Sequence, residues 1–205
     1  MLGTITPELF PNECQVIEII SDTQYVYPIF KNGSSSLVRS GYPLISDQQL
    51  SAIKNVEVYV REPHDRFVSG VQTYLSKLDS KADIKTALYF IEKYLYLNRH
   101  FCPQIFWLMN LRRFTNASIT IKPIESITQI TNFNINQSKR DLELVKHFEQ
   151  KSKVRFYNEI DEVLTINLLG KTVEFNEIIE LLKENYSELY FELFTRCRDI
   201  IDVVS

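Results

Sequence analysis

The residues best suited to bind an anion form a short segment, residues 31–36, with the sequence Lys-Asn-Gly-Ser-Ser-Ser. Lysine brings a mobile positive charge, glycine lets the backbone approach a ligand oxygen closely, and serine hydroxyls add hydrogen-bond donors. When such a loop leaves a strand and opens a helix, backbone N–H groups also point at one spot. We therefore expect a phosphate-like group to be bound by Lys31, Asn32, Gly33, Ser34, Ser35 and Ser36. For this segment by itself, an ordinary surface turn is the alternative.

A second pair of residues with phosphate-binding chemistry follows further along the chain. Arg61 ends an apolar stretch, and Ser69, eight residues later, falls about two turns into the helix expected next. A guanidinium offers a planar fork of donors and a serine offers one directional hydrogen bond, so together they can hold one phosphate. Taken separately, a surface ion pair explains Arg61 and a solvated helix position explains Ser69 equally well.

Both groups of residues are expected to follow a strand and precede a helix. β-Branched and aromatic runs predict strands at residues 14–20, 24–30, 56–60 and 119–124. Apolar periodicity predicts an amphipathic helix over 64–79, and a serine can cap a helix that continues through 37–39. Further helices are expected at 47–54, 84–95, 141–151 and 174–204. This alternation indicates an α/β fold with a mainly parallel central sheet flanked by helices.

Composition limits the classes of function. A chain of 205 residues suits one domain, and a formal net charge of −3 gives no general attraction to nucleic acid or to anionic lipid. The three cysteines form no CxxC pair, which argues against both a disulfide framework and a structural zinc site. The N-terminus lacks a basic and then apolar leader, and no stretch reaches the ~20 apolar residues of a membrane span. We expect a cytoplasmic protein that does not bind membranes, and its oligomeric state stays open.

Taken together, residues 31–36 and 61–69 resemble the donor-binding motifs of sulfotransferases that use 3′-phosphoadenosine 5′-phosphosulfate (PAPS). In that family the lysine meets the bridging oxygen of the donor, and the amides and hydroxyls that follow hold the 5′-phosphate. Arg61 and Ser69 match the residues that bind the 3′-phosphate. Two positions depart from the family's pattern, Glu62 in place of aspartate and Phe30 in place of proline. The resemblance implies one sulfotransferase-like domain over residues 1–205 with a three-layer, P-loop-like fold.

A third segment extends the resemblance. Residues 99–104, Arg-His-Phe-Cys-Pro-Gln, are similar to the His-aromatic-x-Pro-Gln segment of the carbohydrate sulfotransferase branch. This implies a hydroxyl-bearing acceptor such as a glycan. Residues 134–139 are similar to a later polar segment of the same branch, which implies nucleotide contacts from Ser138 and Lys139. A solvated loop explains that last segment equally well.

The resemblance also suggests how the reaction would proceed. Sulfuryl transfer needs in-line geometry and stabilisation of the leaving oxygen, for which Lys31 is the candidate, and it requires no metal. The product is 3′,5′-adenosine bisphosphate. An acceptor hydroxyl benefits from a base that titrates near neutral pH, and His100 is the leading candidate, with a packed structural histidine as the alternative. His64 could touch the acceptor, Glu62 is a weaker base, and His147 is expected to face solvent.

Two other functions stay open. One is a non-catalytic nucleotide-binding or interaction module of the same fold. The other is a P-loop nucleotide kinase, which is disfavoured because G-x-x-x-x-G-K-[ST] appears nowhere in the chain. Arg66 is interpreted as structural, with Glu62 or Asp65 as its ion-pair partner. The identity of the acceptor is beyond what these patterns determine.

Overall fold

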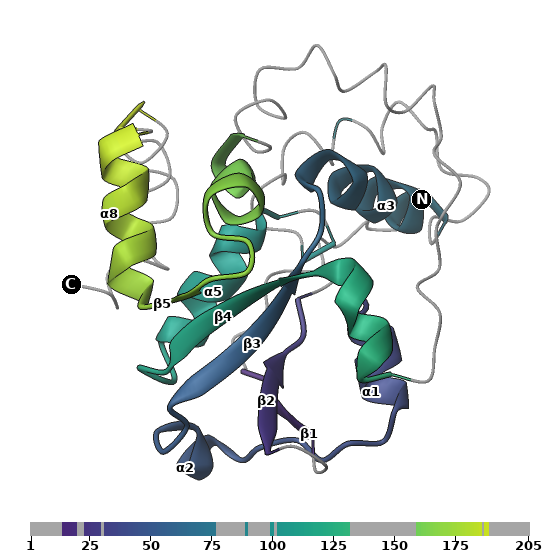
Figure 1. Cartoon of the computed structure of the whole chain (residues 1–205). Helices are drawn as coiled ribbons and strands as arrows, with labels where there is room; N and C mark the ends of the chain where they lie inside the picture. The colour runs from purple at the N-terminus through teal and green to yellow at the C-terminus, as the bar shows by residue number, and fades with distance from the viewer. Residues whose placement is uncertain are drawn as a thin grey trace.

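A five-stranded sheet forms the centre of the fold in the computed structural model, which describes residues 14–19, 23–29, 31–76, 89, 99–100, 102–131, 159–185 and 187–188 (Figure 1). The strands lie side by side in chain order: β1 (Ile17–Ile19), β2 (Gln24–Tyr27), β3 (Asn55–Val60), β4 (Ser118–Pro123) and β5 (Thr172–Val173). The parallel pairing predicted for the sheet is confirmed for β2, β3 and β4, whereas β1 and β5 pair antiparallel with their neighbours. The structure is therefore α/β with a mixed sheet.

The antiparallel edge at β1 has a simple cause. Only residues 20–23 separate β1 from β2, and a connection this short can join antiparallel strands but not parallel ones. β2 and β3, by contrast, are joined by a longer segment that contains α1 (Ser34–Arg39) and α2 (Asp47–Leu50). The two strands that carry the predicted anion-binding residues are thus parallel neighbours.

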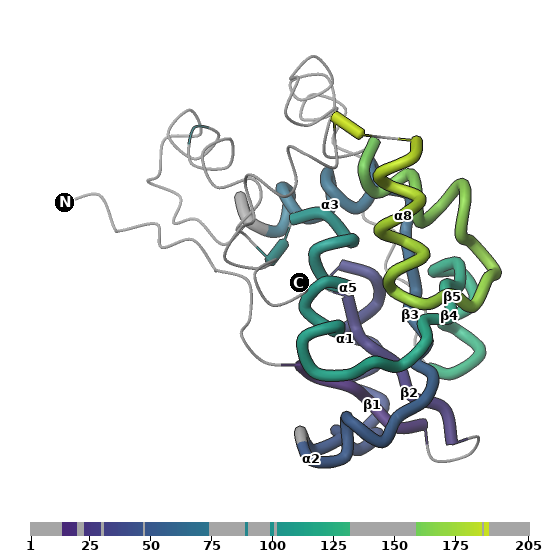
Figure 2. The backbone as a smooth tube through the Cα atoms, turned by 90° about the vertical axis from the view of Figure 1, so that its left-hand side faces the viewer, coloured from purple at the N-terminus to yellow at the C-terminus, as the bar shows by residue number. Residues whose placement is uncertain are grey.

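Helical elements cover both faces of the sheet, as the two views show (Figures 1 and 2). On one face, Val56, Val58 and Val60 of β3 pack with α5 (Gln104–Arg112), the π-helical η2 (Val163–Asn167) and α8 (Phe175–Asn185). On the other face, Tyr59 of β3 packs with Leu37 of α1 and with the 3-10 helix η1 (Ile124–Gln129). Because alternate residues of a strand point to opposite faces, β3 is buried on both sides.

Several predicted elements differ in extent from those observed. The strand predicted at 119–124 is β4, which ends at Pro123, and η1 begins at the next residue. The helix predicted at 64–79 is α3 (Pro63–Ser76). The helix predicted at 174–204 begins as α8, and that at 47–54 is the shorter α2. The helices expected at 84–95 and 141–151 lie outside the described residues, apart from residue 89. None of the helices in the described part of the chain is long and apolar enough to cross a membrane.

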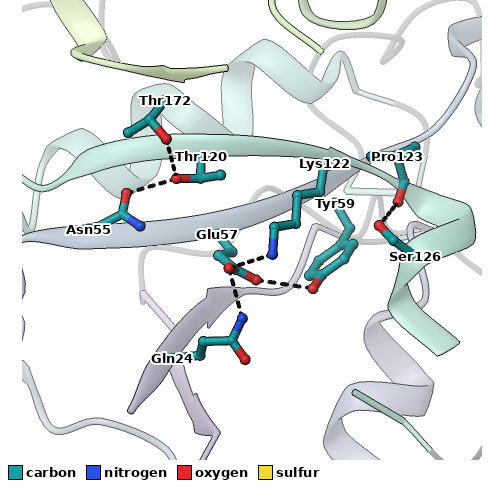
Figure 3. A network of polar contacts seen from close by, with 9 residues as sticks. All are labelled: Gln24, Asn55, Glu57, Tyr59, Thr120, Lys122, Pro123, Ser126 and Thr172. Carbon is teal, nitrogen blue, oxygen red and sulfur yellow. Dashed lines mark hydrogen bonds and ion pairs between the residues drawn. The ribbon is translucent and has the colours of Figure 1, made fainter. Parts of the chain in front are cut away.

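A polar cluster lies on the face of the sheet that carries α1 and η1 (Figure 3). The Glu57 carboxylate accepts hydrogen bonds from Gln24 Nε2 at 2.8 Å, from Lys122 Nζ at 2.6 Å and from the Tyr59 hydroxyl at 3.1 Å. Burial together with the adjacent Glu57 charge raises the pKa of Tyr59 above its ordinary range. We call these four residues the sheet-face cluster. They come from three adjacent strands, and each of these three hydrogen bonds joins two side chains of the cluster.

Candidate functional site

The predicted anion-binding segments meet at one edge of the sheet because β2 and β3 run parallel. Tyr27 pairs with Val58, so the turn at residues 31–33 and Arg61 both follow the carboxyl ends of neighbouring strands. The first segment then enters α1 and the second enters α3 (Figure 1). The two strand-loop-helix units expected from the sequence are confirmed.

The turn at residues 31–33 has an unusual backbone. Both Lys31 and Gly33 have positive φ, 72° and 76°, and the Asn32 N–H donates to the Ile29 carbonyl at 3.0 Å. A Cβ on Gly33 would lie 2.6 Å from Cδ1 of Ile127 in η1, so a side chain here would be strained by the backbone conformation and would require Ile127 to shift. Glycine is therefore favoured here by packing as well as by conformation.

The start of α1 differs from the sequence prediction. A serine was expected to cap the helix, but the N-cap is Gly33, whose carbonyl accepts the N–H groups of Ser36 and Leu37. The positive φ of Gly33 turns the chain directly into the helix, which places Ser34 inside its first turn. No carbonyl among the described residues accepts the N–H groups of Gly33, Ser34 or Ser35.

The Lys31 side chain joins the first segment to the second. Its ammonium donates a hydrogen bond to Thr73 Oγ1, and that hydroxyl donates to the Ser69 carbonyl at 3.0 Å. Lys31 thus lies against α3 about one turn beyond Ser69, which is half-buried on the same helix. Thr73 was not among the residues predicted from the sequence.

Arg61 is half-buried directly after β3. Its burial lowers the pKa of the guanidinium, and the carboxylates of Asp65, Glu62 and Glu125 oppose that shift. Glu62 itself caps α3, since its two carboxylate oxygens accept the N–H groups of His64 at 3.0 Å and Asp65 at 2.6 Å. The Glu62 carboxylate is therefore engaged in holding the helix start.

Gln104 connects both segments to the third one. It is fully buried at the start of α5, and its side-chain amide pairs with the backbone of Arg61: Oε1 accepts the Arg61 N–H and Nε2 donates to the Arg61 carbonyl, each at 2.9 Å. Oε1 also accepts a hydrogen bond from Asn32 Nδ2 at 2.5 Å. Asn32 Nδ2 donates further to the Tyr59 carbonyl at 2.8 Å. The side chain of Asn32 therefore holds the turn against the end of β3.

Asp161 fixes the start of α5 in turn. Its carboxylate oxygens accept the N–H groups of Gln104 at 2.6 Å and of Ile105 at 3.0 Å, and the side chain is fully buried. Burial raises the pKa of Asp161 to about 6, which the nearby Arg66 charge and these hydrogen bonds oppose. We call Asn32, Arg61, Gln104 and Asp161 the edge network. Sequence reasoning missed Gln104 and Asp161 as positioning residues, because their partners lie 43 or more residues away.

Arg66, which the sequence analysis interpreted as structural, lies in the interior of the fold. It is fully buried in α3, its Nη1 donates to the Cys102 carbonyl, and its charge acts on Asp161. Arg66 is therefore a buried residue of the fold, and its pairing with Glu62 or Asp65 stays a prediction. The contact with Cys102 fastens the third segment to the second at another point.

Of the other predicted residues, His100 is 1% exposed, in a turn shortly before α5. Ser138, Lys139 and His147 lie outside the described residues. Burial raises the pKa of the Cys102 thiol to about 12, which keeps it protonated and poorly nucleophilic. Within the described ranges, no three His, Cys, Asp or Glu side chains are grouped to hold a metal ion.

A cavity of about 370 Å³ lies at the opposite edge of the sheet, near the amino ends of β2 and β3. Gln24, Asn55 and Glu57 line it, and none of the predicted site residues does.

No protein family matches the chain, and no curated protein or solved structure is significantly similar to it. The candidate site therefore rests on its own geometry.

Proposed function

We propose that this chain binds PAPS and transfers its sulfuryl group to an acceptor hydroxyl. One observation carries the proposal: the three segments that resemble sulfotransferase motifs are joined by hydrogen bonds. Lys31 reaches Thr73 on α3, Asn32 reaches Gln104, and Gln104 pairs with Arg61. These bonds bring segments separated by up to 72 residues in sequence together at one end of the sheet, which supports a shared role for them.

The donor would occupy the carboxyl edge of the sheet. Its 5′-phosphosulfate would accept hydrogen bonds from the N–H groups of Gly33, Ser34 and Ser35, and its 3′-phosphate would be held by Arg61 and Ser69. A guanidinium already partly withdrawn from water loses less solvation when a phosphate arrives, which favours Arg61 for this role. The three-layer, P-loop-like fold and the cytoplasmic location inferred from the sequence belong to this proposal.

In the reaction, the acceptor oxygen attacks sulfur as the bond from sulfur to the 5′-phosphate oxygen breaks. The sulfuryl group moves to the acceptor, and 3′,5′-adenosine bisphosphate leaves. Lys31 exchanges its Thr73 contact for the leaving oxygen, whose negative charge it stabilises. His100, which is 1% exposed, would have to become accessible to the acceptor before it could take the proton, and without such a change the proton goes to water. A hydroxyl on a glycan is the acceptor class that the third segment favours.

Calorimetric titration tests donor binding. We expect the wild type to bind 3′,5′-adenosine bisphosphate about 30-fold more tightly than adenosine 5′-monophosphate, because a phosphate held by arginine and serine contributes about 2 kcal/mol. Arg61→Ala should remove this preference. Arg113→Ala, which deletes an exposed arginine after α5, should retain it. Equal or absent binding of the two nucleotides by the wild type would refute the proposal.

Transfer activity separates an enzyme from a binding module. With radiolabelled donor and a panel of glycans, Lys31→Ala should abolish transfer while retaining most of the bisphosphate affinity. Lys54→Ala, at an exposed position just before β3, is the matched control and should remain active. A wild type that binds the bisphosphate and transfers nothing to any acceptor would establish a non-catalytic module instead.

A further inference from the structure

The side chain of Gln104 pairs with the end of β3 as a neighbouring strand would. Its amide bonds both the N–H and the carbonyl of one residue, Arg61, at 2.9 Å each. Since the Arg61 N–H only donates and its carbonyl only accepts, the orientation of the Gln104 amide is determined by these partners. Both polar groups of the Arg61 backbone are therefore bonded to a single side chain.

The same amide oxygen also determines where the anion-binding turn lies. Gln104 Oε1 accepts Asn32 Nδ2 at 2.5 Å, so one oxygen atom bonds both the turn and the residue after β3. Asn32 is 1% exposed and Gln104 is fully buried, so water does not compete for these bonds. A shift of Gln104 would alter the separation between the turn and Arg61.

Gln104 itself is held from the far side of the site. Asp161 accepts its backbone N–H and that of Ile105, which fixes the first turn of α5, and the buried Arg66 compensates the charge of Asp161. The amide is therefore supported by main-chain bonds at its base and by Arg61 and Asn32 at its tip. This is the arrangement expected of a rigid spacer.

We propose that Gln104 is a positioning residue that fixes the distance between the two phosphate-binding segments, and so confers selectivity for nucleotides with phosphates at both the 3′ and the 5′ position. The inference rests on the proposed function. Each segment can bind one phosphate without Gln104, but only a fixed separation lets one rigid nucleotide satisfy both together. Loss of Gln104 should therefore reduce selectivity rather than the affinity for a single phosphate.

The test compares two buried amides of the same helix. Gln104→Met removes the spacer at similar volume, and Asn110→Leu removes a buried amide that donates to the Tyr27 hydroxyl at 3.1 Å, away from the predicted site residues. Affinities for 3′,5′-adenosine bisphosphate and adenosine 5′-monophosphate are measured by calorimetry, and stability is measured by urea unfolding. We expect the affinity ratio to fall about tenfold in Gln104→Met and to stay at the wild-type value in Asn110→Leu.

The outcomes distinguish a failure of this inference from a failure of the proposed function. A wild type without preference for the bisphosphate overturns both. A wild type with that preference and an unchanged ratio in Gln104→Met overturns the spacer alone, as does an equal loss in Asn110→Leu. If Gln104→Met does not fold, Asn32→Leu breaks the same link from the turn and decides the question by the same ratio.

Discussion

Two polar groups in the interior, the edge network and the sheet-face cluster, use their hydrogen bonds differently. The edge network ends on main-chain atoms: the Arg61 N–H and carbonyl, the Tyr59 carbonyl, and the N–H groups of Gln104 and Ile105. The sheet-face cluster joins side chain to side chain around Glu57. A main-chain group left without its partner stays in the protein, whereas a side-chain pair can be removed as a unit. The first arrangement therefore positions segments, and the second only neutralises a charge.

The largest effect should come from Asp161→Ala. This change leaves two N–H groups of α5 without an acceptor and removes a carboxylate that the buried Arg66 charge stabilises, so we expect the free energy of unfolding to fall by about 4 kcal/mol. Urea unfolding followed by circular dichroism measures it. Glu180→Ala, which breaks an exposed pair with Lys183, should cost less than about 0.5 kcal/mol. A cost below about 1 kcal/mol for Asp161→Ala would remove the distinction between the two polar groups.

Gly33→Ala tests the turn that the edge network holds. We expect a loss of about 3 kcal/mol, because alanine is strained at a φ of 76° and its Cβ meets Ile127. Gly41→Ala has nearly the same φ, 74°, with nothing near the added carbon, and should cost about 1 kcal/mol. Ile127→Val removes the Cδ1 atom in question and should restore part of the loss in Gly33→Ala. Equal costs at the two glycines would show that the close approach to η1 is unimportant.

The pH dependence of stability should distinguish Asp161 from an ordinary exposed carboxylate. Burial raises its pKa from 3.8 to about 6, so the folded chain binds this proton more tightly than the unfolded chain does. Its stabilising contribution is therefore full below about pH 4 and is lost as the pH rises through 6. Relative to Asp161→Asn, the wild type should gain about 2 kcal/mol of unfolding free energy between pH 7 and 4.5. Parallel pH curves for the two proteins would contradict this assignment.

The smallest effect should come from removing the sheet-face ion pair as a unit. The double substitution Glu57→Gln with Lys122→Met should stay within about 1 kcal/mol of the wild type, because no main-chain group loses a partner. Lys122→Met alone should cost more than the double substitution. Among the observed partners of the Glu57 carboxylate it leaves Gln24 and Tyr59, which are both neutral. A double substitution as costly as Asp161→Ala would mean that the two polar groups are equivalent.

The parts of the fold that could be predicted are those with local signals. The alternation in β3 and the apolar spacing of α3 are visible in short windows, and Pro63 marks a helix start. The positions of Lys31, Arg61 and Ser69 at strand ends and on the following helix came from the same signals.

The parts that could not be predicted lack such signals. Residues 104–111 of α5 are all buried, so the helix shows no polar face and no helical period. β5 has only two residues, too few for an alternation. The bonds from Gln104 to Asn32 and Asp161 span 72 and 57 positions, and nothing in a single sequence pairs residues so far apart. The place in the fold of the candidate ligand-binding residues could therefore be predicted, whereas the residues that position them required the three-dimensional structure.

The bond between Asp161 and the start of α5 has a consequence for amide hydrogen exchange. First-turn N–H groups of a helix have no intrahelical acceptor and normally exchange with solvent deuterons as soon as the helix end frays. Here the amide protons of Gln104 and Ile105 are bonded to a buried carboxylate, so we expect them to exchange only when the start of α5 separates from Asp161. The exchange rates of these two protons therefore report on this contact, and they can be measured without any substitution.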